Sequence, residues 1–249
     1  MHILLVNDDG IHAPGIRTLA QTLASRGHRV SVCAPDRERS AASHSITLRE
    51  PVTAQRVDLP GAETAYAASG TPADCARLGL YLIPDVELVI SGINNGPNLG
   101  GACIYSGTVG AATEAAMSGV PALASSLCIF NSEDYSAAAE VTARVAEWMV
   151  DHPLRRGEIY NLNVPPLPYG ELRGVRAAVS APNFLDSAVY REVETEDGVV
   201  YRYALGENVP IEDPNCDQLL MEAGYATLTR LTWDLRADAE DPDVSALIL

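Results

Sequence analysis

Residues 3–10 of the chain read Ile3-Leu4-Leu5-Val6-Asn7-Asp8-Asp9-Gly10. The apolar run that opens this stretch predicts a buried strand, and the two carboxylates come where that strand would leave the core. In open α/β sheets, ligands bind just outside the carboxyl ends of the strands. Two neighbouring acids repel each other unless a cation or a shared proton offsets the repulsion. The stretch therefore indicates a divalent-metal site, and the alternative is an acidic turn that caps the next helix.

Strand and helix signals alternate outward from this stretch. We expect strands at residues 3–7, 29–34, 86–90, 121–125, 159–164 and 225–231, with shorter β stretches at 45–48 and 53–57. We expect helices at residues 14–25, 72–82, from about 108, 137–150 and 217–222. Thr71 is the expected N-cap of the second helix, with Pro72 in its first turn. The alternation predicts an α/β protein with a mainly parallel sheet and helices on both faces.

The last third of the chain changes character. Short β-like segments surround an acidic turn at residues 192–197. We interpret residues 172–210 as a C-terminal β-hairpin arm, which makes a monomer the less favoured state. The sequence contains no internal repeat, so we expect one domain over residues 1–249.

Composition restricts the class of protein. Hydrophobic residues make up 47% of the 249 residues and charged ones 20%, which indicates a folded globular chain. The longest apolar runs are far shorter than a membrane span, and the N-terminus enters a strand pattern at once, so we expect no membrane association and a cytoplasmic protein. The five cysteines are scattered and odd in number, which argues against a disulfide framework or a zinc finger.

The charge balance excludes further classes. Seventeen basic and 33 acidic residues give a net charge of −16, which argues against a nucleic-acid-binding surface. All seventeen basic residues are arginines, and the absence of lysine excludes Schiff-base catalysis and P-loop phosphate binding. A small anionic substrate would therefore need a metal ion or backbone N–H groups.

Three loops after predicted strands carry the polar residues, and in a parallel sheet they share one rim. The first holds the acid pair, the second (residues 35–45) contains Ser40 and His44, and the third (residues 91–101) is rich in Asn and Gly. Carboxylate, hydroxyl and amide oxygens suit a hard cation such as Mg²⁺ or Mn²⁺. Each later loop has a plainer alternative: Ser40 as a helix cap or exposed hydroxyl, His44 as a polar loop residue, and the third loop as a structural turn.

A fourth segment, Tyr105-Ser106-Gly107-Thr108-Val109, leads into a helix of small residues. Small residues at a helix start let backbone N–H groups approach an anion, which predicts a phosphate cradle; the alternative is an ordinary Ser/Thr N-cap. No GxGxxG follows the first strand, and the adjacent acids differ from the Asp-x-Asp pattern of phosphoaspartate enzymes. A metal site beside an anion cradle points to phosphoryl chemistry.

Several motifs together resemble the SurE (survival protein E) nucleotidases. They are Asn7-Asp8-Asp9-Gly10, Ala34-Pro35-Asp36-Arg37 with Ser40, Ser45-Ile46-Thr47, Gly70-Thr71-Pro72-Ala73-Asp74-Cys75, residues 91–100 and Tyr105-Ser106-Gly107-Thr108-Val109, followed more weakly by Asn161-Leu162-Asn163-Val164-Pro165. The resemblance implies a Rossmann-like core and a homodimer or homotetramer that exchanges its C-terminal arm. It also implies a metal-dependent phosphatase acting on nucleoside 5′- and 3′-monophosphates and, in some members, on short polyphosphate.

Matched motif to motif, the resemblance assigns site residues. One divalent cation per subunit, Mg²⁺ or Mn²⁺, would be held by the metal ligands Asp8, Asp9, Ser40 and Asn94. The phosphate-binding positions would be Asn98, Ser106, Gly107 and Thr108. Asp8 and Asp9 are the expected catalytic residues; the group that takes the proton from water is open between Asp9 and His44. The alternative functions are a non-catalytic nucleotide-binding regulatory protein and an NAD-type oxidoreductase, the latter weakened by the missing glycine fingerprint.

Overall fold

The computed structural model describes residues 1–182, 189–204 and 210–233. The strands are β1 (His2–Val6), β2 (Arg29–Pro35), β3 (Ala54–Val57), β4 (Thr64–Ala68), β5 (Leu88–Asn95), β6 (Ala122–Leu127), β7 (Glu158–Val164), β8 (Val175–Ala178), β9 (Val189–Thr195), β10 (Gly198–Ala204) and β11 (Ala226–Thr232). The α-helices are α1 (Pro14–Ser25), α2 (Pro72–Leu82), α3 (Gly107–Met117), α4 (Ser136–Trp148) and α5 (Asp217–Glu222). The 3-10 helices of the described residues are η1 (Gly100–Tyr105) and η2 (Tyr169–Glu171).

Within these residues one large sheet of nine strands runs in the order β3-β4-β2-β1-β5-β6-β7-β11-β8. The strands from β4 to β7 are parallel to their neighbours, whereas β3 pairs antiparallel with β4, and β11 pairs antiparallel with β7. The predicted α/β class, with its mainly parallel sheet, is confirmed.

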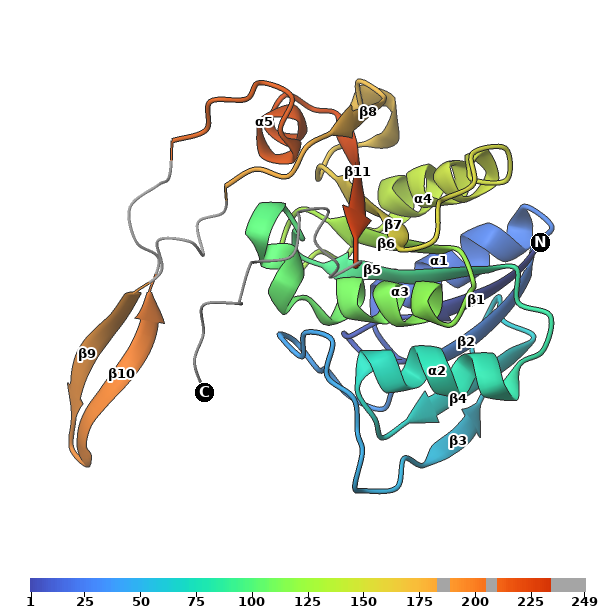
Figure 1. Cartoon of the computed structure of the whole chain (residues 1–249), viewed down its shortest axis with the longest axis horizontal. Helices are drawn as coiled ribbons and strands as arrows, with labels where there is room; N and C mark the ends of the chain where they lie inside the picture. Colours follow the sequence, from blue (N-terminus) through green and yellow to red (C-terminus); the bar gives the residue numbers. More distant parts are fainter. Residues whose placement is uncertain (183–188, 205–209, 234–249) are drawn as a thin grey trace, which may run out of the picture.

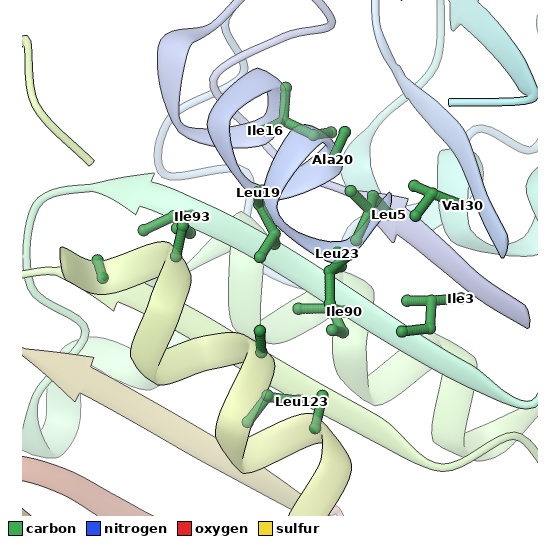
Figure 2. Packing of buried hydrophobic residues seen from close by; sticks show 14 of the residues in the cluster. Ile3, Leu5, Ile16, Leu19, Ala20, Leu23, Val30, Ile90, Ile93 and Leu123 are labelled. Atoms are coloured by element: carbon green, nitrogen blue, oxygen red, sulfur yellow. The ribbon is translucent and has the colours of Figure 1, made fainter. Parts of the chain in front are cut away.

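Strand β1 shows why this sheet is covered on both faces. Ile3 and Leu5 point into one core with α1 and α4, and Leu4 and Val6 point into the other with α2 and α3. All four side chains are fully buried, and each such burial contributes about 2 kcal/mol. Figure 1 shows the two helix pairs on opposite faces, and Figure 2 shows the side chains of α1 meeting those of β1 and β5.

Helix boundaries follow the sequence signals closely. The hydroxyl of Thr71 accepts a hydrogen bond from the Asp74 N–H, and the Asp74 carboxylate accepts one from the Thr71 N–H, so a capping box starts α2. Pro72 occupies the first turn, as predicted.

Three elements differ from the expectations. Residues 45–48 form no strand, because Thr47 donates through both its N–H and its hydroxyl to the Asp74 carboxylate, so the segment is fixed to α2. Strand β4 was not predicted, since Thr64-Ala65-Tyr66-Ala67-Ala68 is rich in alanine, which disfavours strands. Strand β5 begins later than predicted and extends to Asn95, so Asn94 lies in the strand and not in the loop after it.

The hairpin expected within residues 172–210 is present as β9 and β10, which form a separate two-stranded antiparallel sheet. Figure 1 shows it standing apart from the large sheet. Strand β8 belongs instead to the large sheet, beside β11. Parts of the predicted arm, residues 183–188 and 205–209, lie outside the described residues.

Candidate metal and phosphate site

The Asn7 side chain builds the turn that presents the acid pair. Its Nδ2 donates to the Gly10 carbonyl oxygen at 2.9 Å, and its Oδ1 accepts from the Gly10 N–H at 3.2 Å. Gly10 has a φ of 99°, a conformation that favours glycine. The N-cap of α1 is Ala13, and among the described residues no side chain caps that helix. The alternative that the acids cap the next helix is therefore wrong.

Asp8 lies against the N-terminus of α3. The Thr108 hydroxyl donates to Asp8 Oδ1 at 2.5 Å, and both residues are buried. A Cβ atom at Gly107 would fall 2.9 Å from Asp8 Oδ2, so only glycine permits this approach. Burial raises the pKa of Asp8, and the Thr108 hydrogen bond opposes that rise.

Asp9 is the less buried of the two acids. Its Oδ2 accepts the Asn95 N–H at 3.0 Å. Burial, and next the charge of Asp8, raise the pKa of Asp9 to about 7. Both carboxylates are thus costly to ionise when no cation is near, and a divalent cation would offset that cost.

The second predicted loop reaches the acid pair through its backbone. The Arg39 N–H donates to the Asp8 carbonyl oxygen at 2.7 Å. Ser40 is exposed, and its hydroxyl donates to Glu38 Oε1 at 2.6 Å. The charge of Glu38 adds to the raised pKa of both acids. Sequence reasoning missed Glu38, although it stands two residues before the proposed ligand Ser40.

Asn94 comes from the end of β5, on the other side of β1 from that loop. Its Nδ2 donates to the Gly96 carbonyl oxygen at 2.8 Å, and within the described residues its Oδ1 has no partner. The carboxylates of Asp8 and Asp9, the Ser40 hydroxyl and Asn94 Oδ1 are oxygen donors of the kind that a hard cation prefers. Their assignment as ligands of one cation stays a prediction. Groups of three or more His, Cys, Asp or Glu able to hold a metal are absent from the described residues, but such a group would not include a serine or an asparagine.

The four predicted phosphate positions are only partly free to bind phosphate. The Ser106 hydroxyl accepts the Val109 N–H at 3.1 Å and so acts as the N-cap of α3, as the alternative had it. The Thr108 hydroxyl is held by Asp8. The first turn of an α-helix leaves backbone N–H groups without partners inside the helix, and here that turn begins at Gly107, beside the acid pair.

Asn98 is buried in a network of asparagines. Its Nδ2 donates to Ser126 Oγ at 2.9 Å, and its N–H donates to Asn163 Oδ1 at 2.9 Å. Its carbonyl oxygen accepts from Asn161 at 2.8 Å and from Asn163 at 3.0 Å. The side chain therefore fixes the loop, and its role toward phosphate stays a prediction. Asn161 and Asn163 were missed as loop-holding residues, although their two-residue spacing on a strand places them on one face.

Asp217 holds the same loop from the far end of the chain. Its fully buried carboxylate accepts backbone N–H groups from Gly100 and from Ala181, each at 2.9 Å. A buried carboxylate with several backbone donors is well satisfied. The C-terminal part of the chain thereby orders η1, which leads directly into the start of α3.

Glu114 is a buried ionic junction under the second loop. His44 Nε2 lies 2.8 Å from one of its oxygens, and Arg77 Nε donates to the other at 2.7 Å. A Cβ atom at Gly110 would fall 2.4 Å from the Ser43 carbonyl oxygen, so the loop lies directly on α3. Sequence reasoning assigned no role to Glu114, because a lone acid in a helix of small residues gives no signal of its partners.

A comparison with known families decides the identity. The family model described as "Survival protein SurE" matches residues 3–185. The chain belongs to the SurE family. The matched region contains every predicted metal and phosphate residue.

Similar SurE proteins match along almost their whole length. The chain is 44% identical over 242 residues to the 5′-nucleotidase SurE of Desulfitobacterium hafniense, covering 94% of this chain and 92% of that one. It is 40% identical over 248 residues to the 5′/3′-nucleotidase SurE of Erwinia tasmaniensis, covering 99% and 96%. The crystal structure of the SurE protein from Aquifex aeolicus has a TM-score of 0.82 at 33% identity and covers 95% of each chain. The SurE resemblance predicted from the motifs is therefore confirmed.

Proposed function

We propose that the chain is a divalent-metal-dependent phosphatase that hydrolyses nucleoside 5′- and 3′-monophosphates to nucleoside and phosphate. The observation that supports this most directly is the hydrogen bond between Thr108 and Asp8, because it joins the acid pair to the start of α3. A cation held by the acid pair and the N-terminus of α3 could then bind the same phosphoryl group. The similarity to proteins named 5′-nucleotidase and 5′/3′-nucleotidase supports the same substrate class.

Different residues would hold the cation and the phosphoryl group. One Mg²⁺ or Mn²⁺ per subunit would be held by Asp8, Asp9, Ser40 and Asn94. When bound, such a cation supplies Lewis-acid polarisation of a phosphoryl oxygen and makes a water molecule more acidic. At the start of α3 the Val109 N–H is held by Ser106, so the N–H groups that remain free in this turn would bind phosphoryl oxygens and stabilise the negative charge that develops on them.

Of the two candidates for accepting the proton from water, the geometry favours Asp9. His44 Nε2 is paired with Glu114, which lies on α3 beneath the second loop. Asp9 has one oxygen on the Asn95 N–H, and within the described residues its other oxygen has no hydrogen-bond partner. An oxygen of this kind can receive a proton from water held at the same site.

We further propose that the β9–β10 hairpin binds a second copy of the chain. Two-stranded hairpins are marginally stable alone, and this one exposes Tyr190, Tyr201 and Tyr203, each by more than half. A dimer or tetramer would cover these rings.

Among the described residues, no helix is long and apolar enough to cross a membrane. All five cysteines, each in the described part, are free, which supports a reducing compartment such as the cytoplasm.

The test is phosphate release from AMP and 3′-AMP with Mn²⁺, followed by EDTA. Asp8→Asn removes a ligand charge at constant size, and we expect it to lower kcat/KM at least about 100-fold. Glu50→Gln, at an exposed acid in the same half of the chain, is the matched control and should retain activity. Sustained release that EDTA stops excludes a pure nucleotide binder. Full, chelator-sensitive activity in Asp8→Asn would show that the metal assignment is wrong.

A further inference from the structure

Phe130, one of only two phenylalanines in the chain, lies in the turn after β6 with its side chain 67% exposed. Large apolar side chains are usually removed from water, so an exposed ring held in a fixed place is informative. One edge of this ring is fixed: a Cβ atom at Gly96 would fall 2.3 Å from Phe130 Cε1 and 2.8 Å from Cδ1. The ring therefore rests on the backbone of Gly96, where no larger residue fits.

The turn that carries Phe130 is tied to the acid pair by two hydrogen bonds. The Asn131 N–H donates to Asn95 Oδ1 at 2.7 Å, and the Asn95 N–H donates to Asp9 Oδ2 at 3.0 Å. Asn131 has a φ of 58°, a conformation that asparagine tolerates better than most residues. Gly96 follows Asn95 directly, and neighbouring Cα atoms lie about 3.8 Å apart. The ring is thus one residue step from the backbone that contacts Asp9.

A monophosphate whose phosphoryl group lies at Asp8 and Asp9 must extend its nucleoside toward the rim of the site. We propose that Phe130 provides the surface on which the base of the substrate stacks. This inference rests on the proposed function, and it identifies the part of the substrate that the phosphate site does not hold. Aromatic side chains stack on any base, because every base has a π-face.

The chemistry of the ring sets the expected selectivity. Phenylalanine has no hydrogen-bonding atom, so it cannot distinguish the polar edges of the bases. It favours substrates with a base over substrates without one, and purines over pyrimidines because a purine covers more apolar surface. Tyr105, exposed by 56% and directly before Ser106, is the competing aromatic residue at this rim.

The experiment compares AMP with ribose 5-phosphate, which carries the same phosphoryl group on the same sugar but has no base. Phe130→Leu keeps an apolar side chain over Gly96 and removes the π-face, and Phe130→Tyr keeps the π-face. We expect Phe130→Leu to raise KM for AMP roughly tenfold, at the lower end of base–aromatic stacking, with kcat nearly unchanged. Its kcat/KM for ribose 5-phosphate and its Mn²⁺ affinity should equal those of the unaltered protein. Tyr81→Leu, at an exposed tyrosine at the end of α2, is the remote control.

Recovery of AMP affinity in Phe130→Tyr supports the proposal. Equal losses on AMP and ribose 5-phosphate, no loss on either, or a base-specific loss in Tyr105→Leu instead would overturn it. Calorimetric affinities of AMP and ribose 5-phosphate, measured beside the turnover assay, test base stacking separately from the phosphatase activity. If neither compound is hydrolysed, the proposed function fails, while a base-dependent loss of binding in Phe130→Leu still supports the stacking surface.

Discussion

Gly110→Ala is expected to separate the activity of this protein from its stability. Inside a helix, alanine is favoured over glycine by up to about 1 kcal/mol. Here the new Cβ atom would fall 2.4 Å from the Ser43 carbonyl oxygen and 3.0 Å from His44 Cα. Close C···O contacts are ordinarily about 3.3–3.6 Å, so the loop must move by about 1 Å. The same loop carries Ser40, and a displacement of that size at a reacting site can lower the rate about 100-fold.

We therefore expect Gly110→Ala to retain a thermal midpoint close to that of the unaltered protein and to lose about 100-fold in kcat/KM for AMP. Phosphate release and thermal unfolding, measured on one preparation with Mn²⁺, give both quantities. Gly79→Ala in α2 is the contrasting variant, because its Cβ atom would fall 2.8 Å from Leu4 Cδ2 in the core. It should unfold at a lower temperature and keep its activity below that temperature. A Gly110→Ala protein with full activity would refute the claim that contact with α3 positions the Ser40 loop.

Three other predictions concern the Asp9 carboxyl, the buried carboxylate of Asp217 and the ion pair of Arg26 with Glu147. In the folded, metal-free protein the pKa of Asp9 is raised to about 7, so Mn²⁺ must displace a proton from this carboxyl at lower pH. Calorimetry should therefore find Mn²⁺ binding roughly tenfold tighter at pH 8 than at pH 6. Equal affinities at the two pH values would refute the assignment of Asp9 as a metal ligand. Asp217→Ala leaves buried N–H donors such as that of Gly100 without an acceptor, and urea unfolding should show a loss of about 3 kcal/mol. Arg26 donates two hydrogen bonds to Glu147 and lowers the pKa of that carboxyl to about 2. The stabilisation is fully present above the unfolded pKa of Glu147 and is lost as the pH falls toward 2. Solvent screens this exposed pair, so Arg26→Ala should lower the free energy of unfolding by about 1 kcal/mol at pH 7 and by much less at pH 2.5. An equal loss at both pH values would contradict an ionic origin of the stabilisation.

Elements with strong local signals were predictable from the sequence. The bounds of α1 were predicted to the residue, because Pro14 fixes its start, and α2 followed from Thr71 and Pro72. The loops that follow β1 and β2 were expected at one rim, and a backbone hydrogen bond from Arg39 to Asp8 does join them. A parallel sheet brings strand ends together whatever the distance along the chain, so this proximity needed no more than the order of the elements.

The contacts that complete the site were not predictable in the same way. The partners of Glu114 come from two other segments, and those of Asp217 include a residue 117 positions away. Such pairs depend on the packing of whole elements, which short-range patterns do not encode. Ser106 and Thr108 were predicted to bind phosphate, but in the structure both hydroxyls already have partners. Ser106 bonds within α3 and Thr108 bonds to Asp8, and the sequence alone does not show such contacts.

The central position of β1 has a consequence during synthesis. This strand leaves the ribosome well before one of its two neighbours, β5, which begins at Leu88, the residue with which Ile3 is paired. At typical elongation rates the intervening chain takes roughly 4 to 17 s to appear. Throughout that time the segment Ile3-Leu4-Leu5-Val6 has an unpaired edge. Its apolar side chains also lack the two cores that bury them in the completed fold. Strand β1 therefore cannot be fully buried until β5 has followed it, and until then its apolar segment needs protection from aggregation.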